Sequence, residues 1–121
     1  MAEMIARSFD SPDEVRPFAD KGQIALVHVP GGAVGKGTFE PGWRWSEHVK
    51  PIAHTDSCQV HHLGYVLQGR MRMAADGGGD EVEVGPGEVF DIAPGHDAWI
   101  VGDETCVLID FAGASVYAKP A

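Results

Sequence analysis

Basic residues are scarce in this sequence. Lys and Arg number 9 against 18 Asp and Glu, which gives a formal net charge of −9 with neutral histidines. An acidic chain repels a phosphate backbone, and no cluster of Lys or Arg offsets that repulsion, so we expect no nucleic-acid partner. Anionic membrane surfaces are disfavoured for the same reason. No apolar run approaches the roughly 20 residues that a membrane span needs, so we expect no membrane partner.

Cysteine is also sparse, with Cys58 and Cys106 as the two copies. They are too far apart to form a CxxC motif, and two cysteines do not make a disulfide framework, which favours a reduced intracellular protein. Residues 1–7 lack the basic segment followed by an apolar one that is typical of a secretion signal. We therefore expect a cytoplasmic location.

Glycine and proline are plentiful, with 16 and 8 copies in 121 residues, and they separate short apolar segments. This pattern predicts many short strands joined by tight turns. The expected strands cover residues 23–29, 33–40, 43–50, 60–67, 71–75, 81–84, 88–92, 98–101 and 105–111.

Three further segments have local sequence patterns that predict a turn or a short helix. Residues 68–70 are expected to close a hairpin, and the glycine-rich stretch 76–80 is expected to turn with positive φ. Ser11-Pro12-Asp13-Glu14 combines an N-cap serine with a first-turn proline and acids, so it predicts a short helical turn that ends before Gly22.

Short, numerous strands with almost no helix predict an all-β fold. A closed or double-sheet antiparallel barrel leaves few exposed strand edges. A barrel of this size can hold one ligand in its interior or mouth. A chain of 121 residues is most simply one domain.

Histidines are concentrated beside these strands. His48, His54, His61 and His62 lie in one stretch, and His96 follows a Pro-Gly turn. Imidazole is a good ligand for zinc, iron, nickel and copper, so this grouping indicates a metal or small-molecule site. In a regular strand His61 faces away from His62, which points to His62 as the site residue of that pair.

Two stretches carry spaced glycines and histidines. Residues 42–69 follow Gly-x5-His-x-Lys, then a loop, then His-x6-Gly, and residues 87–102 contain a Gly, a Pro-Gly-His turn and a further Gly. These stretches resemble the two motifs of the cupin superfamily, G-x5-H-x-H-x3/4-E-x6-G and G-x5-P-x-G-x2-H-x3-N. The sequence departs from both motifs. In the first, Lys50 replaces the second His and His62 replaces the Glu. In the second, the Pro, His and Asn of the motif are replaced by Ala93, Ala98 and Gly102.

The resemblance implies a fold for the whole chain. Cupins are jelly-roll β-barrels, so we expect a single cupin domain over residues 1–121 with its barrel core at about 20–112. The chain is also similar to short single-domain bacterial cupins that share the stretches Gly-Trp-Arg-Trp-Ser-Glu-His-Val-Lys-Pro-Ile and Pro-Gly-His-Asp-Ala-Trp. Cupins commonly pair through their sheets, which implies a homodimer.

The resemblance also implies a divalent metal ion inside the barrel. His48 and His62 occupy ligand positions of the first motif, and His96 lies two residues before the ligand of the second. Cys58 and His54 lie in the loop that this sequence inserts, and either could supply a fourth ligand. A thiolate at Cys58-x3-His62 favours zinc. We expect zinc or iron, with nickel, manganese or copper as alternatives.

Arg44, Lys50 and Trp99 are the candidate substrate-binding residues. Arg44 and Lys50 share a strand face with His48, and such a cationic interior would suit a small anionic molecule such as a carboxylate. In the alternative, both side chains extend to the barrel rim with their charges in water. Trp43 and Trp45 alternate with them, so we expect both to pack on the outer sheet face or at a subunit interface.

Three functions follow from these residues. The first is a metal-binding small-molecule cupin, which as an enzyme would be a metal-dependent oxygenase, isomerase or lyase; the fold does not choose among these. The second is a metal-free ligand-binding or sensor module on the same barrel, since Lys50 and the absent glutamate weaken the usual ligand set. The third is a structural interaction domain, which predicts a barrel filled with side chains and no cavity.

Overall fold

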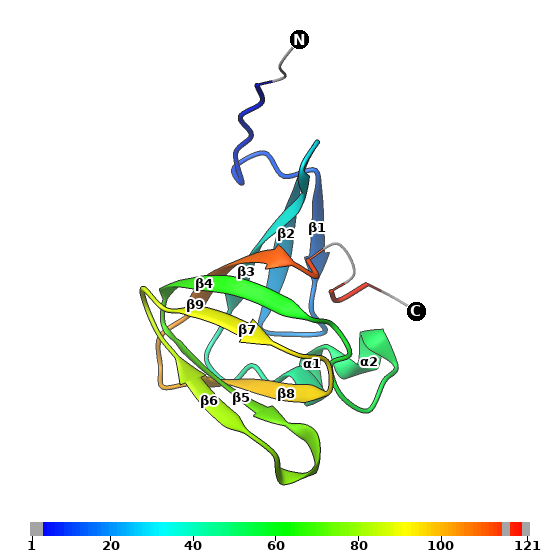
Figure 1. The fold of residues 1–121 in the computed structure, drawn as a ribbon, viewed down its shortest axis with the longest axis vertical. Helices are drawn as coiled ribbons and strands as arrows, with labels where there is room; N and C mark the ends of the chain where they lie inside the picture. The colour runs from blue at the N-terminus through cyan, green and yellow to red at the C-terminus, as the bar shows by residue number, and fades with distance from the viewer. Residues whose placement is uncertain (1–3, 115–116, 120–121) are drawn as a thin grey trace.

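Nine antiparallel strands form two sheets that face each other, as seen in the computed structural model, which describes residues 4–114 and 117–119 (Figure 1). The larger sheet has the order β1-β2-β3-β9-β4-β7, and the smaller sheet has the order β6-β5-β8. The elements in chain order are β1 (Glu14–Pro17), β2 (Gly22–Val29), β3 (Gly32–Phe39), α1 (Trp45–His48), α2 (Lys50–Ala53), β4 (His62–Gln68), β5 (Arg70–Ala75), the 3-10 turn η1 (Asp76–Gly78), β6 (Glu81–Val84), β7 (Val89–Ile92), β8 (His96–Val101) and β9 (Cys106–Ala112).

Strand alternation decides which side chains enter the space between the sheets. Along β9, Cys106, Leu108 and Asp110 are buried while the residues between them are more exposed. In β4, Gly64 and Val66 are buried in the same way. Side chains two apart along a strand share a face, so the inward residues of both sheets build one core. The all-β architecture and eight of the nine expected strands are confirmed.

The expected strand over residues 43–50 is wrong. Arg44 makes an isolated bridge with Trp99, and the chain then turns into the short helices α1 and α2. Trp45 and Val49 are both buried, and the N–H of Val49 bonds the carbonyl of Trp45 at 2.9 Å. Apolar residues four apart fit one helix face, and this spacing outweighs the two-residue alternation of the tryptophans.

The expected helical turn after Ser11 is also wrong, because residues 14–17 form strand β1 against β2. Pro17 would fall inside such a helix, where it removes a backbone donor and clashes with the preceding turn at a cost of about 3 kcal/mol. Asp13 does not begin a helix. Its Oδ2 instead accepts a hydrogen bond from the backbone N–H of His28, in strand β2, at 2.7 Å.

Residues 68–70 turn the chain, but they do not close a hairpin. β4 pairs with β7 and β9 in the larger sheet, whereas β5 pairs with β6 and β8 in the smaller one. Gly69 has φ +76°, and a Cβ at this position would lie 2.6 Å from the Cα of Cys106. The chain therefore passes from one sheet to the other at a corner that only glycine fits without strain. The expected turn over 76–80 is confirmed, with Gly77 and Gly78 at positive φ.

No helix among the described residues is long and apolar enough to cross a membrane.

Candidate metal centre

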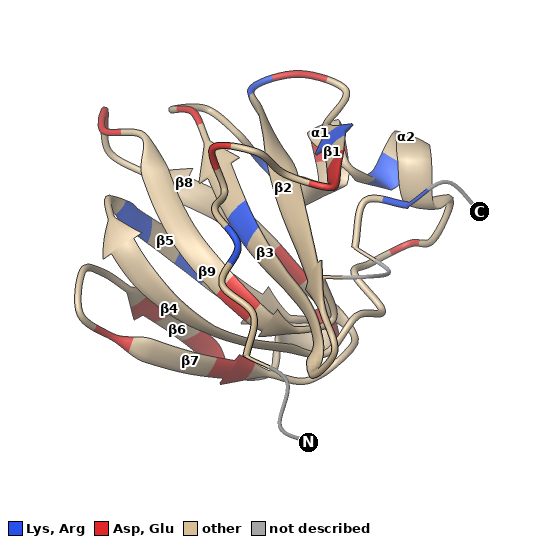
Figure 2. Ribbon diagram, turned by 90° about the horizontal axis from the view of Figure 1, so that it is seen from above, with Lys and Arg blue, Asp and Glu red and all other residues tan. Residues whose placement is uncertain are grey.

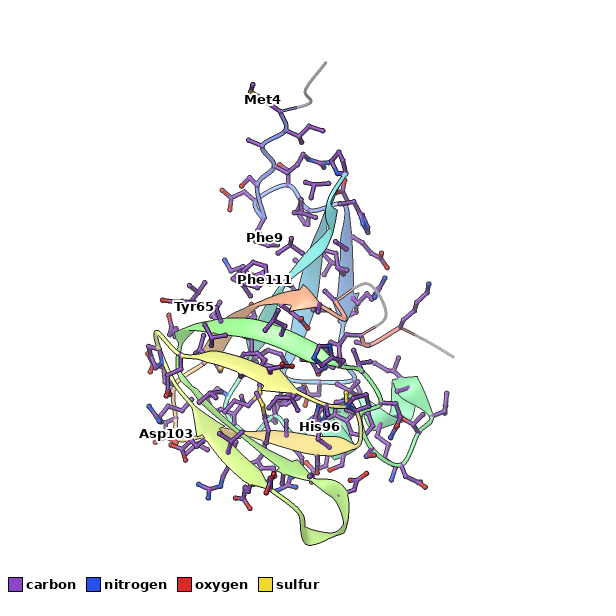
Figure 3. All side chains as sticks on the ribbon, in the orientation of Figure 1. Met4, Phe9, Tyr65, His96, Asp103 and Phe111 are labelled. Carbon is purple, nitrogen blue, oxygen red and sulfur yellow. The ribbon has the colours of Figure 1, made fainter. Side chains whose placement is uncertain are left out.

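Three side chains with metal-binding atoms meet between the two sheets. Cys58, His62 and His96 each offer one ligand atom, and these atoms lie within 4.8 Å of one another. Figure 3 shows His96 in the layer between the sheets, on the side where α1 and α2 lie. Cys58 and His96 are buried, and His62 is half-buried.

The backbone fixes Cys58 against His96. The N–H of Cys58 donates to the carbonyl of His96 at 2.8 Å, and the N–H of Gly95 donates to the carbonyl of Cys58 at 2.7 Å. This isolated bridge ties the loop after α2 to the start of β8. His62 is the first residue of β4, and its side chain enters the same space from the opposite sheet.

A buried carboxylate orients the ring of His62. Nδ1 of His62 lies 2.6 Å from Oδ2 of Asp110, which is 2% exposed. The other carboxylate oxygen of Asp110 accepts the N–H of Ala112 at 3.1 Å. A carboxylate accepts only, so Nδ1 of His62 carries the proton and the Nε2 lone pair is left for another partner.

His96 is oriented in the same sense by a backbone carbonyl. Its Nδ1 donates to the carbonyl of Ala93 at 2.8 Å. Burial lowers the pKa of His96, although the bond to Ala93 acts against that shift. The ring is therefore neutral near pH 7 and presents Nε2 as a ligand atom.

The thiol of Cys58 completes the group. Burial raises the pKa of Cys58 to about 11, so the side chain is a thiol near neutral pH in the absence of a cation. Its Sγ lies 3.5 Å from Nε2 of His62. Because the proton of His62 is on Nδ1, the thiol of Cys58 donates to Nε2 of His62. A divalent ion would replace this proton, because a coordinating thiol is deprotonated outright.

One separation in this group matches an edge of a tetrahedral metal site, and the three ligand atoms lie within 4.8 Å of one another. A zinc ion holds a thiolate sulfur at about 2.3 Å and an imidazole nitrogen at about 2.0–2.1 Å, which sets those two atoms about 3.6 Å apart at the tetrahedral angle. The observed separation of Cys58 Sγ and His62 Nε2 is 3.5 Å. Both histidines also have the outer hydrogen bond that metal-binding histidines almost always make. The donor set therefore suits a divalent transition metal.

A cavity of about 40 Å³ lies beside these residues. Its lining includes His62, His96 and Asp110, and the other lining residues are apolar or aromatic: Ile24, Phe39, Trp43, Trp45, Met71, Met73, Phe90, Ile92, Ala98, Leu108 and Tyr117. The space is large enough for a few waters or a comparably small group. The barrel is thus not completely filled by side chains.

The structure does not bring all the predicted ligands together. His48 ends α1, and its Nδ1 lies 3.0 Å from the backbone nitrogen of Arg44, outside the group of three. His54 is exposed at the end of α2. The placement of His48 follows from the helix that replaces the expected strand. Coordination by Cys58, His62 and His96 stays a prediction.

The predicted substrate-binding residues lie elsewhere. The guanidinium of Arg44 is 3.0 Å from Asp97 and stacks over the ring of Trp99 at 4.4 Å. Lys50 begins α2. Among the described residues, neither these two cations nor Trp99 lines the cavity.

Four residues of the site were not predicted. Asp110 and Tyr117 are not among the predicted site residues. Trp43 and Trp45 are expected on the outer sheet face or at a subunit interface, whereas both are buried and line the cavity. The Tyr117 ring packs edge-on against His62 with ring centres 4.9 Å apart. Asp110 is an acid at an inward-facing position of the apolar strand 105–111, and this pattern indicates a buried functional carboxylate. No local pattern marks Tyr117.

The fold is shared with solved structures of other proteins. A protein of unknown function from Rhizobium leguminosarum bv. viciae matches with a TM-score of 0.60 and 20% identity over 90% of this chain and 95% of that chain. A protein of unknown function from Acidithiobacillus ferrooxidans matches with a TM-score of 0.57 and 20% identity, over 81% and 86% of the two chains. No family model and no curated protein matches the sequence.

Oxalate decarboxylases also share the fold. The enzyme from Lactobacillus farciminis, in its formate complex, matches with a TM-score of 0.60 and 15% identity over 90% of this chain and 33% of that one. This chain therefore spans about a third of that enzyme's length. These likenesses show a shared all-β fold, which agrees with the architecture expected from the sequence.

Proposed function

We propose that this cupin-fold protein holds a divalent transition-metal ion with Cys58, His62 and His96 and binds a small molecule beside it. The 3.5 Å separation of Cys58 Sγ and His62 Nε2 carries the proposal, because it matches the edge of a tetrahedral site. Three protein ligands leave one coordination position open, which is the arrangement of catalytic rather than structural zinc sites.

Zinc and iron remain the expected ions, with copper, nickel and manganese as alternatives. A thiolate with two imidazoles is a soft donor set, which favours zinc or copper over manganese. Such a centre needs a reduced thiol, and a cytoplasmic location would supply it. As an enzyme, the protein would use the ion as a Lewis acid at the open position.

The chain's own residues have clear tasks in this centre. Asp110 accepts the proton on Nδ1 of His62 and so would leave Nε2 free to coordinate an ion. The carbonyl of Ala93 does the same for His96. The surrounding rings of Trp43, Phe90 and Tyr117 exclude bulk water, which strengthens electrostatic interactions at the open position.

Metal analysis of untagged protein tests the proposal. Elemental analysis should find a transition metal in the purified protein or after reconstitution, and Cys58→Ala, His62→Ala and His96→Ala should each lower its content. His48→Ala, His61→Ala and Cys106→Ala are matched controls, because these residues lie outside the group of three. Failure of the wild type to bind any metal would overturn the proposal. Thermal stabilisation by carboxylates alone would favour a metal-free module instead.

We further infer a homodimer formed through the outer face of the larger sheet. Tyr65 on β4 pairs in register with Val89 on β7 and Ile109 on β9. Val89 is 70% exposed, and Phe111 on β9 is 57% exposed. Figure 3 shows Tyr65 and Phe111 on the side of this sheet away from the smaller one. A row of apolar side chains on one sheet face is typical of an interaction surface.

A further inference from the structure

The candidate metal centre is closed to solvent. Cys58 is 1% exposed, and His96 is also buried. The cavity beside them, of about 40 Å³, holds no more than a few waters. A metal ion with its shell of water, or any organic ligand, therefore reaches the centre only after part of the structure opens. Proteins open locally, and segments held by few hydrogen bonds open at the lowest cost.

The last described residues of the chain form a segment of this kind. We call residues 113–114 and 117–118 the C-terminal strap; they follow β9, and none of them lies in a strand. Ala114, Tyr117 and Ala118 are nevertheless buried. Figure 1 and Figure 2 both show the end of the strap near α2, which is the side of the barrel where the candidate metal centre lies.

The strap touches the candidate metal centre through Tyr117. The ring of Tyr117 lines the cavity and packs edge-on against the ring of His62, with centres 4.9 Å apart. Burial raises the pKa of Tyr117, and Cys58 shifts it in the same direction, which indicates that the phenol lies near this cysteine. Movement of the strap would therefore uncover His62 and the space around the Cys58 thiol.

A buried arginine ties the strap to the larger sheet. The guanidinium of Arg16, in β1, donates to the carbonyls of Ala114 at 3.2 Å and Tyr117 at 3.0 Å. Its Nε and Nη2 atoms donate to the carboxylate of Glu14 at 2.7 and 3.0 Å, which fixes the direction of the guanidinium. The N–H of Tyr117 donates to the carbonyl of Gly113 at 3.0 Å, a bond within the strap itself. Arg16 therefore holds the strap closed with charge-assisted bonds.

Two backbone features favour opening at the strap. Gly113 has φ +89°, and a Cβ there would lie 2.2 Å from the carbonyl oxygen of His61, so only glycine fits where the chain turns from β9 into the strap. Ala118 has φ +53°, in the left-handed region that is unfavourable for a residue with a Cβ. Opening relieves this conformation and breaks no ladder of either sheet.

We propose that the C-terminal strap is the entrance gate of the candidate metal centre and that Arg16 is its latch. In the closed state Tyr117 covers His62. When Arg16 releases the two carbonyls, the strap turns about Gly113 and admits the ion or ligand. The inference rests on the proposed function only in taking the group of three as the site. The alternative entrance is a groove of about 490 Å³ whose lining includes His96.

Alkylation of the metal-free protein by iodoacetamide measures opening at two buried thiols of the same chain. Cys58 lies beside the strap, whereas Cys106 lies at the other end of β9. Mass spectrometry of the digested protein gives the two rates separately, and each rate follows the population of the open state. Arg16→Gln should raise the Cys58 rate about tenfold and leave the Cys106 rate unchanged. Glu14→Gln loosens the latch without removing it and should raise the Cys58 rate by less.

Two further variants are controls for this experiment. Arg72→Gln removes an arginine that pairs with Glu81 and Glu83 on the smaller sheet, and it should change neither rate. Val82→Trp narrows the alternative entrance, because Val82 lines the groove, and it should leave the Cys58 rate unchanged. Zinc uptake plays no part in these rates, so a protein that binds no metal would sink the proposed function while alkylation still tests the strap.

Three results would overturn the strap proposal. The first is a Cys58 rate that stays unchanged in both Arg16→Gln and Glu14→Gln. The second is equal acceleration at Cys58 and Cys106 in Glu14→Gln, which would mean global unfolding. The third is a Cys58 rate that falls in Val82→Trp, which would assign the entrance to the groove. Circular dichroism checks that each variant is folded, and if Arg16→Gln is not, Glu14→Gln decides.

Discussion

Nδ1 of His62 lies 2.6 Å from Oδ2 of Asp110, a residue 48 positions further along the chain. The adjacent histidine makes a similar pair in a different environment: His61 contacts Asp91, and both of these side chains are mostly exposed. The two pairs present the same chemical groups, one pair inside the barrel and one outside. The exposed pair of His61 and Asp91 therefore serves as a control when the effect of the buried Asp110 carboxylate on metal affinity is measured.

Asp110→Asn should weaken metal binding about 10- to 100-fold, because the amide cannot hold the His62 proton as a carboxylate does. Competition with a chromophoric chelator at fixed pH measures the affinity. Asp91→Asn should leave it unchanged, since His61 is outside the group of three. Equal losses in both variants would mean that net charge, and not orientation of His62, sets the affinity.

Metal affinity should rise with pH because binding displaces the proton of Cys58. The pKa of this thiol is about 11 without the ion, so the proton is present throughout the range from about pH 6 to 8 and must leave on coordination. His96 has a lowered pKa and is ready to coordinate as the neutral ring. The apparent affinity should therefore rise about tenfold per pH unit for the Cys58 proton.

The controls for this pH dependence are the two cysteine variants. Cys106→Ala should keep the slope, because Cys106 is a buried thiol with a pKa of about 12 that lies outside the group of three. Cys58→Ala should reduce both the affinity and the slope. Isothermal titration in buffers of different ionisation enthalpy counts the released protons. An unchanged slope in Cys58→Ala would rule out the thiolate as a ligand.

Most strands could be predicted from the sequence because they depend on local patterns. Alternation in strands such as Glu81–Val84 and glycine at the turn over 76–80 are properties of short segments. The strand predicted after Gly42 is wrong for an equally local reason. Its tryptophans alternate as in a strand, while Trp45 and Val49 have helical spacing, and the tertiary structure decides between the two.

The candidate site was predicted only in part because its members meet through long-range pairing. Residue type and resemblance to the cupin motifs predict Cys58, His62 and His96 as site residues, and the structure brings them together. His48 matched the motif best, yet it lies outside this group. The bond from His62 to Asp110 depends on the pairing of β4 with β9. No pattern within either strand specifies that register on its own.

Gly69→Ala should destabilise the fold far more than Gly77→Ala. Both glycines have φ near +75°, so alanine is strained at each by about 1–2 kcal/mol. At position 69 the new methyl would also collide with the backbone of Thr105 and Cys106, whereas nothing lies within 4 Å at position 77. We expect a loss of about 3 kcal/mol or more for Gly69→Ala. Urea unfolding measures both variants, and equal losses would mean that the corner between the sheets relaxes freely.

Val89→Glu and Phe111→Glu should convert the inferred homodimer into a monomer, because each places a charge on the apolar outer face of the larger sheet. Val82→Glu is the matched control: Val82 is an exposed valine on an edge strand, but β6 belongs to the smaller sheet. Sedimentation equilibrium over a range of protein concentrations measures the association, and a stable interface of this kind buries about 800 Å² per partner. Dissociation in Val82→Glu, with association retained in the other two variants, would place the interface on the smaller sheet. A monomeric wild type would remove the dimer altogether and leave the apolar face of β4, β7 and β9 without a role in self-association.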